Sequence, residues 1–211
     1  MSSRGVVAVG DSLIDGHADS MAAVPSHSIG FWVALAADEP FSIYARGGID
    51  SNQIVTEQLP RVNDQYRFGL FDMGTNDAFN GSLSDLAANV RTAALMMRQH
   101  CDTVAMLSVP YSQEANVLVT QAAREFDIPV IDASVKGARL LGTDGIHLTA
   151  LGYLEVADRL ASVWGTPLPS LLAKNAGRGS LGTRWWANYA VNVAYSSARS
   201  LARTARKVAR G

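Results

Sequence analysis

Three residues from opposite ends of the chain have the side chains needed for nucleophilic catalysis. Ser12 lies in the segment Gly-Asp-Ser-Leu, which directly follows a short apolar run, and Asp144 lies three positions before His147. A serine hydroxyl is a weak nucleophile unless a base takes its proton, and an imidazole suits this role because its pKa lies near neutral pH. A carboxylate bonded to the other ring nitrogen fixes the tautomer and stabilises the imidazolium. The three residue types therefore suit acyl transfer, provided that the fold brings them together.

Acyl transfer also needs hydrogen-bond donors for the negatively charged oxygen of the tetrahedral intermediate. The predicted donors are the backbone N–H groups of Ser12 and Gly48 and the side-chain amide of Asn76. Gly48 lies in Arg-Gly-Gly-Ile-Asp-Ser and Asn76 in Gly-Thr-Asn-Asp, and each segment follows an apolar run. Each short segment alone is also typical of a turn, since Gly, Asp, Ser and Asn favour turn conformations. The decision therefore depends on the elements that position them.

Short apolar runs alternate with helical patterns along the first 164 residues. The runs are apolar throughout rather than alternating, which indicates strands of a parallel sheet covered on both faces. The expected strands span 6–9, 41–45, 68–73, 103–109 and 129–133, and the expected helices span 27–37, 51–63, 83–100, 112–126 and 149–164. Five βα units in succession predict right-handed crossovers and a doubly wound, flavodoxin-like, three-layer α/β/α sandwich with a five-stranded parallel sheet.

The helix expected over 83–100 has the clearest pattern. Its apolar residues recur at helical spacing, and Ser82 followed by Asp85 resembles a capping box at its start.

Ligands of such sheets bind beyond the carboxyl ends of the strands, where the strand order reverses. If the order is 2-1-3-4-5, the first and third strands are neighbours at that point. Ser12 and Asn76 would then face each other, and Asp144 and His147 would reach the same edge after the fifth strand.

These blocks and their order resemble the GDSL or SGNH hydrolases, also called GDSL esterases and lipases. The family's landmarks are Gly-Asp-Ser-Leu, a glycine after the second strand, Gly-x-Asn-Asp and Asp-x-x-His, and here they span residues 10 to 147. The resemblance implies the SGNH hydrolase fold, with Ser12 as nucleophile, His147 as base and Asp144 as its orienting carboxylate. It also implies that Gly48 and Asn76 are oxyanion donors. Gly47 is the neighbouring alternative, but Gly48 matches the family's Gly-x-x-Ser/Thr spacing to Ser51.

Other polar residues near these blocks have simpler interpretations. Asp11 and Asp77 are expected to bond backbone amides around the two turns. His17, His27 and His100 lack the clustered partners of a metal site and are expected at the surface or in loops, although His17 and Asp15 follow the nucleophile closely enough to touch substrate. We expect neither a metal nor an organic cofactor. The single cysteine, Cys101, excludes an internal disulfide.

The charge distribution divides the chain into two parts. The net charge is −1, but eight of the 18 Lys and Arg residues follow residue 173, whereas all 19 Asp and Glu residues precede it. The segment after Trp164 contains two prolines and several Gly and Ser residues, which is typical of a linker. We therefore expect a hydrolase domain over residues 1–173 and a basic, aromatic-containing helical tail over 174–211.

The tail has the composition of an amphipathic helix. From Arg199, basic residues recur at spacings that place them on one arc, with apolar residues opposite and Trp185, Trp186, Tyr189 and Tyr195 upstream. This suits peripheral contact with an anionic membrane, although docking on the acidic body or disorder is also open, and nucleic-acid binding is the less favoured partner. The N-terminal apolar run is too short for a secretion signal, so we expect the chain in the cytoplasm or at the inner membrane surface.

The pattern favours a serine hydrolase that cleaves carboxylic esters through an acyl-enzyme. No lid-sized insertion interrupts the body, so an open cleft for small acyl esters such as acetates is expected, with thioesters and lysophospholipids as further substrates. One alternative is an acyltransferase that uses the same triad with an alcohol in place of water. Another is a non-catalytic binding module recruited by its tail, which the four intact blocks disfavour.

Overall fold

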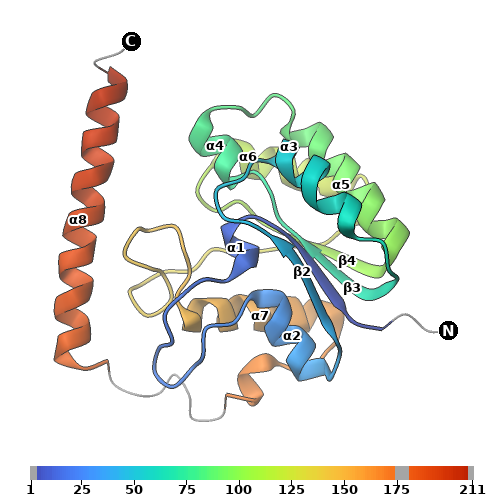
Figure 1. Cartoon of the computed structure of the whole chain (residues 1–211), viewed down its shortest axis with the longest axis horizontal. Coiled ribbons are helices and arrows are strands. Elements are labelled where there is room, and N and C mark those ends of the chain that lie inside the picture. The colour runs from blue at the N-terminus through green and yellow to red at the C-terminus, as the bar shows by residue number, and fades with distance from the viewer. Residues whose placement is uncertain (1–3, 174–180, 209–211) are drawn as a thin grey trace.

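The computed structural model describes residues 4–173 and 181–208, and it contains a five-stranded parallel sheet between two layers of helices (Figure 1). The strand order is β2-β1-β3-β4-β5, the order that places the first and third strands side by side. The strands are β1 (Val6–Gly10), β2 (Phe41–Ala45), β3 (Tyr66–Phe71), β4 (Cys101–Leu107) and β5 (Val130–Ile131). The predicted three-layer α/β/α architecture is confirmed.

Two helices cover one face of the sheet, and the helices within residues 51–124 cover the opposite face. The first layer consists of α2 (Ile29–Ala37) and α7 (Ala150–Trp164), which lie below the sheet in Figure 1. The second layer contains α3 (Ser51–Gln53) with its continuations η1 (Ile54–Gln58) and η2 (Leu59–Arg61), then α5 (Leu86–His100) and α6 (Gln113–Arg124). Three further helices are short: α1 (Ser12–Asp15) follows β1, α4 (Thr75–Asn80) follows β3, and η3 (Pro169–Leu171) follows α7.

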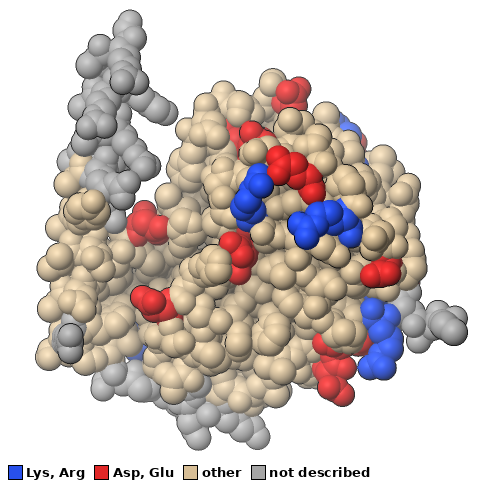
Figure 2. Space-filling view, viewed as in Figure 1, with Lys and Arg blue, Asp and Glu red and all other residues tan. Residues whose placement is uncertain are grey.

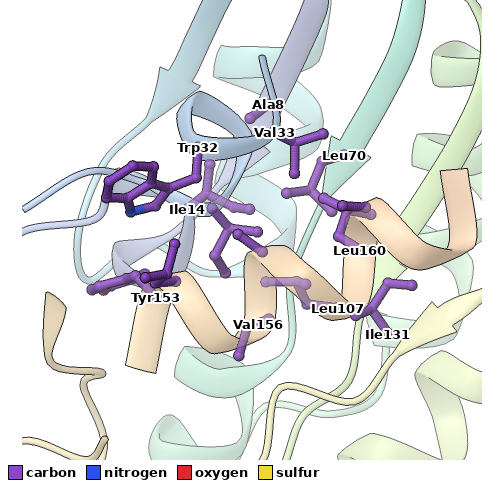
Figure 3. Packing of buried hydrophobic residues seen from close by; sticks show 14 of the residues in the cluster. Ala8, Ile14, Trp32, Val33, Leu70, Leu107, Ile131, Tyr153, Val156 and Leu160 are labelled. Atoms are coloured by element: carbon purple, nitrogen blue, oxygen red, sulfur yellow. The ribbon is translucent and has the colours of Figure 1, made fainter. Parts of the chain in front are cut away.

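Successive strand residues point into two separate cores. Val6 and Ala8 of β1 are buried against α2 and α7, whereas Val7 and Val9 are buried on the side of α5 and α6. Figure 3 shows strand residues such as Leu70 and Leu107 packed over Leu160 of α7. Because both faces are covered, the strands are apolar throughout, and this is the pattern that predicted a parallel sheet.

Two helix predictions need correction. The helix expected from residue 83 begins at Leu86, and Asp85 is its N-cap residue without a side-chain cap bond, so the capping box at Ser82 and Asp85 is wrong. Ser82 belongs to the end of α4 instead, because its N–H donates to the carbonyl of Asp77.

The helix expected over 51–63 is also divided, since it passes from α-helix through a π-helical to a 3₁₀ segment. Pro60 lies in this last segment and has no N–H to continue the α-helical hydrogen bonds.

A long helix, α8 (Thr183–Val208), stands beside the body (Figure 1). Leu181, just before α8, and Trp185, in its first turn, are partly buried against the core between the sheet and the layer of α2 and α7. Within residues 4–173 and 181–208, no helix combines the length and the apolar character needed to cross a membrane. The domain boundary at residue 173 remains a prediction. Of the basic residues in the predicted tail, Lys174, Arg178 and Arg210 lie outside the described residues, as do the side chains of Arg184, Arg199, Arg203, Arg206 and Lys207.

Candidate active site

Ser12 lies where β1 turns into the short helix α1. Asp11 is the N-cap residue of α1, and its carboxylate accepts a hydrogen bond from the N–H of Leu13 at 2.9 Å. This bond holds the turn that directs Ser12 out of the sheet edge, and it confirms the structural role expected for Asp11. At the C-terminal side of the turn, the phenol of Tyr153, from α7, donates to the carbonyl of Ser12 at 3.3 Å.

The backbone of Gly10, at the start of the same turn, is also fixed by hydrogen bonds. Buried Gln58 accepts from the N–H of Gly10 at 3.1 Å and donates to its carbonyl at 3.0 Å. A Cβ atom on Gly10 would lie 1.8 Å from Oδ1 of Asp72, which leaves no room for any other residue. Asp72 Oδ1 itself accepts from the N–H of Asp11 at 2.9 Å. The turn that carries the serine is therefore bonded to two neighbouring segments.

Asp144 and His147 lie in the loop between β5 and α7. Oδ1 of Asp144 accepts from the N–H groups of Ile146 and His147, and this arrangement closes the loop around the carboxylate. The carbonyl of His147 accepts from the N–H of Gly142 at 2.7 Å, and the phenol of Tyr111 donates to the carbonyl of Ile146. These bonds fix the backbone on both sides of the imidazole.

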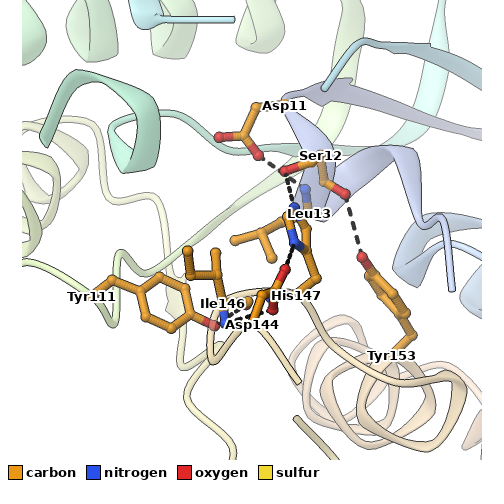
Figure 4. A network of polar contacts seen from close by, with 8 residues as sticks. All are labelled: Asp11, Ser12, Leu13, Tyr111, Asp144, Ile146, His147 and Tyr153. Carbon is orange, nitrogen blue, oxygen red and sulfur yellow. Dashed lines mark hydrogen bonds and ion pairs between the residues drawn. The ribbon is translucent and has the colours of Figure 1, made fainter. Parts of the chain in front are cut away.

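The three candidate catalytic side chains meet at one point beyond the sheet (Figure 4). Nε2 of His147 lies 2.9 Å from Oγ of Ser12, although the two residues are 135 positions apart in the chain. Nδ1 of His147 lies 2.5 Å from Oδ2 of Asp144. Because a carboxylate only accepts hydrogen bonds, Nδ1 carries the proton and Nε2 is free to accept one from the serine. The order Ser-His-Asp and its connectivity are those of a catalytic triad.

The electrostatics of the pair favour a charged imidazolium. The hydrogen bond to Asp144 raises the pKa of His147 and outweighs the opposing effect of partial burial, with further support from the charges of Asp144 and Asp11. Partial burial raises the pKa of Asp144, but hydrogen bonds from the His147 side chain and from two backbone N–H groups bring it down to about 2. Asp144 is therefore ionised at neutral pH and stabilises the proton that His147 would take from Ser12.

The backbone N–H groups of Ser12 and Gly48 remain available as oxyanion donors. Among the described residues, none accepts a hydrogen bond from the N–H of Ser12 or of Gly48. Gly48 has a φ of +81°, a conformation that favours glycine, and it is exposed to solvent. A Cβ atom on adjacent Gly47 would lie 3.6 Å from Cβ of Ser12, whereas one on Gly48 would have no atom within 4 Å. Gly47 therefore lies beside the nucleophile, and Gly48 is the next residue in the chain.

The amide of Asn76 is close to the nucleophile turn but has other partners. Its Nδ2 donates to Oδ2 of Asp11 at 3.0 Å and to the carbonyl of Ile49 at 2.8 Å. Asn76 thus links the third strand end to the first, as the strand order predicts, and also to the segment after Gly48. Asp77 has the structural role expected of it, because it accepts from the N–H of Ser51 at 3.0 Å.

Sequence reasoning did not identify three residues that support the turn. Asp72, Gln58 and Tyr153 are buried and contact the backbone of residues 10 to 12. A signal existed for Asp72, since a carboxyl group that ends a buried apolar strand needs a partner. Gln58 and Tyr153 lie in helical segments where neighbouring apolar residues conceal their polar atoms, so no sequence signal separates them from core residues.

The other histidines have contact partners outside the triad. Nε2 of His17 lies 3.1 Å from Oδ2 of Asp15. The ring of His27 packs against Phe31 and Trp32. Nδ1 of His100 lies 3.1 Å from the carbonyl of Asp64. Within the part of the chain that the structure describes, no group of three or more His, Cys, Asp or Glu residues is arranged to hold a metal ion.

A pocket of about 420 Å³ lies directly beside the imidazole. The loop of the candidate triad lines one side, through residues that include Asp144 and His147, and the segment after α1 lines another, through residues that include His17 and Asp19. The third side is α8, which contributes Trp185, Asn188, Tyr189 and Asn192. The open cleft expected from the sequence is thus bounded on one side by a helix that the sequence suggested only as a tail.

Comparison with known proteins gives one family match and a set of similar structures. The model of the family described as GDSL-like Lipase/Acylhydrolase matches residues 6–160. No curated protein matches the chain.

Several solved structures share the fold. The psychrotrophic esterase EstA from Pseudoalteromonas sp. has a TM-score of 0.56 and 14% identity, over 77% of this chain and 97% of that one. A member of the lipolytic protein G-D-S-L family from Veillonella parvula has a TM-score of 0.51 and 18% identity, over 76% and 98% of the two chains. The acetyl xylan esterase Est2A from the rumen bacterium Butyrivibrio proteoclasticus has a TM-score of 0.57 and 13% identity, over 78% and 65%. At these identities the likeness establishes the fold.

Proposed function

Since this chain belongs to the GDSL-like lipase/acylhydrolase family and is an ester-hydrolysing enzyme, we propose that it cleaves small acyl esters through an acyl-enzyme on Ser12. The observation that carries the proposal is the chain of contacts from Ser12 Oγ through both ring nitrogens of His147 to Asp144, at 2.9 and 2.5 Å.

The proposed reaction has two halves. In the first, Nε2 of His147 takes the hydroxyl proton while Oγ of Ser12 attacks the carbonyl carbon of the ester. The resulting oxyanion accepts hydrogen bonds from the N–H groups of Ser12 and Gly48, and a slight shift of the Asn76 amide away from Asp11 adds a third. His147 then gives its proton to the leaving oxygen, the alcohol departs, and the acyl group stays on Ser12.

In the second half, water takes the place of the alcohol. His147 removes a proton from the water, the hydroxide oxygen attacks the acyl carbon, and the proton returns to Oγ as the carboxylic acid leaves. The side chains of His147 and Asp144 are 41% and 40% exposed, so water reaches the imidazole freely. This exposure supports hydrolysis over transfer to a second alcohol, which requires that water be excluded.

The experiment compares the native chain with Ser12→Ala. We expect the native chain to hydrolyse p-nitrophenyl acetate and butyrate faster than longer esters, and to be labelled at Ser12 by a fluorophosphonate probe. Ser12→Ala should lose the labelling and almost all turnover. Equal turnover by the two proteins would overturn the proposal, and a preference for long acyl chains would overturn its small-acyl part.

We further propose that α8 places the enzyme at the inner surface of an anionic membrane. Trp186 and Tyr195 of α8 are 47% and 63% exposed, and the sequence from residue 174 onward is rich in Lys and Arg without Asp or Glu. Exposed aromatic and apolar groups together with basic residues suit the headgroup region of such a membrane. A chain ending at residue 173 should lose sedimentation with anionic vesicles, and unchanged sedimentation would contradict this proposal.

A further inference from the structure

One wall of the pocket beside His147 is formed by residues that lie outside the family match. The matched region ends at residue 160, whereas α8 begins at Thr183 and lines the pocket with Trp185, Asn188, Tyr189 and Asn192. A ligand in this pocket would therefore contact a helix that lies outside the family match.

The position of the pocket identifies which part of an ester it would hold. His147 and Asp144 line the pocket, whereas Ser12 and the other proposed oxyanion donors, Gly48 and Asn76, do not, so the pocket lies on the imidazole side of the nucleophile. Under the proposed function, His147 hands its proton to the leaving oxygen, so the alcohol part of the ester lies on the side of the imidazole. We propose that α8 forms a wall of the binding site for the leaving alcohol, and that this site selects neutral alcohols bearing several hydroxyl groups, such as a sugar ring.

The aromatic part of the wall fits the apolar face of a ring. Trp185 and Tyr189 lie with their ring centroids 5.1 Å apart and an interplanar angle of 22°. They are already stacked on each other, so a ligand that covers them does not have to order them first. The apolar C–H face of a sugar ring gains from burial against such a surface.

The polar part of the wall fits hydroxyl groups. Asn188 and Asn192 provide amides that both donate and accept, and Asp19 and Thr143 provide further oxygen atoms on the opposite side. A few polar groups around an apolar surface are typical of a specific small-molecule site. The hydroxyl groups of a sugar both donate and accept hydrogen bonds, so they can pair with these amide and oxygen atoms.

The charge of the pocket disfavours phosphorylated alcohols. Asp19 and Asp144 line it, and its described lining residues include no Lys or Arg. Figure 2 shows acidic side chains on the face next to α8, with most of the Lys and Arg side chains of this view farther toward the opposite side. A phosphate near two carboxylates is repelled, so glycerophosphate esters are expected to be poorer substrates than neutral polyol esters.

The test uses three acetate esters of primary alcohols and the full chain. They are 6-O-acetylglucose, ethyl acetate and 1-acetylglycerol 3-phosphate, so that the acyl group is constant and only the alcohol changes. We expect Tyr189→Ala to lower kcat/KM for 6-O-acetylglucose roughly fivefold to tenfold, mainly through KM, with ethyl acetate unchanged. Val191→Ala, on an exposed position of the same helix, serves as the matched control and should change neither. The phosphate ester should be the poorest of the three substrates for the native chain.

A binding measurement separates this inference from the proposed function. Saturation-transfer NMR with methyl glucoside should detect binding to Ser12→Ala, and the signal should disappear in the double variant Ser12→Ala/Tyr189→Ala. If the native chain hydrolyses ethyl acetate but Tyr189→Ala behaves like Val191→Ala with the sugar ester, the pocket inference is wrong and the proposed function stands. If the native chain hydrolyses no ester while methyl glucoside still binds through Tyr189, the proposed function fails and the pocket inference stands. Absence of methyl glucoside binding overturns the inference.

Discussion

The backbone N–H of Asp11 donates a hydrogen bond to Oδ1 of Asp72 at 2.9 Å, where β1 and β3 end side by side. Both carboxyl groups are buried, and burial raises the pKa of each. The negative charge of Asp11 raises the pKa of Asp72 further, and the Asp11 carboxylate accepts hydrogen bonds from Leu13 and Asn76. The residue before the nucleophile is thus held by a buried carboxyl group whose pKa is raised well above its ordinary value.

Substitution of Asp72 should separate hydrogen bonding from charge. Asp72→Asn keeps an acceptor for the N–H of Asp11 and has no group to ionise, so we expect near-native turnover at pH 7 and a free energy of unfolding at least as high as that of the native chain. Asp72→Leu leaves that buried N–H without a partner, which should lower the free energy of unfolding by about 1–3 kcal/mol and also lower kcat. Urea unfolding and ester assays on both variants check this. If both variants behave alike, the bond does not position the turn.

The stability of the native chain should also depend on pH through Asp72. Its pKa is raised from 3.8 on folding, so between 3.8 and the raised value the folded state binds more protons than the unfolded state. The free energy of unfolding therefore falls as pH rises through this interval, and it is unaffected by Asp72 below 3.8. Asp72→Asn should remove this part of the slope. The prediction fails if urea unfolding at several pH values gives parallel curves for the two proteins.

The pH dependence of turnover should report the pair of His147 and Asp144. His147 acts as a base only when neutral, and its pKa is raised above 6.5, so kcat/KM should rise with pH through an inflection above 6.5. Asp144→Asn removes the main cause of the shift, so the inflection should move to lower pH, and kcat should fall about 10⁴-fold. Glu57→Gln, which removes an exposed partner of Arg46, is the control and should leave the profile unchanged. An unmoved inflection in Asp144→Asn would contradict the assignment.

Asn76 should affect both turnover and stability, because its amide has two tasks. Its Nδ2 bonds to Asp11 and to the carbonyl of Ile49, and it is the proposed third donor to the oxyanion. Asn76→Ala should lower kcat about 10²- to 10³-fold and the free energy of unfolding by about 1–3 kcal/mol. Asn89→Ala removes a bond to Ser51 instead and should leave kcat largely intact. Lost stability with unchanged kcat would assign Asn76 a structural role only.

The sequence predicted the arrangement of Ser12 and Asn76 because strand patterns and strand order determine which loop ends meet. Apolar runs on both faces of each strand predicted the parallel sheet, and that sheet places residues after β1 and β3 at the same edge. Helix starts were less accurate. Ser82 has a suitable type for a cap, but its N–H is bonded to the preceding helix, which only tertiary structure reveals.

The residues that support the nucleophile turn, and those of α8 that line the pocket, could not be predicted from the sequence for a different reason. Gln58 acts on Gly10 from 48 positions away, and nothing in the local pattern of a helix tells which polar side chain turns inward. The inner face of α8 was likewise hidden, because Trp185 and Tyr189 at helical spacing fit a membrane surface as well as a pocket. Only their place in the pocket that His147 also lines distinguishes the two, and this place is set by packing between distant segments.

Gly10 offers the sharpest test of how the nucleophile turn is built. A Cβ atom there would lie 1.8 Å from Oδ1 of Asp72 and 2.6 Å from Cγ1 of Ile14, so Gly10→Ala must displace either the buried carboxyl group or α1. We expect a loss of about 3 kcal/mol or more in the free energy of unfolding, together with a fall in kcat because Ser12 shifts relative to His147. Gly81→Ala is the matched control, since Gly81 also has a positive φ, of +73°, but has no atom within 4 Å of the added Cβ. It should lose only about 1 kcal/mol and keep native turnover. Equal losses in the two variants would show that backbone conformation, and not the close approach of Asp72, is what requires glycine before the nucleophile.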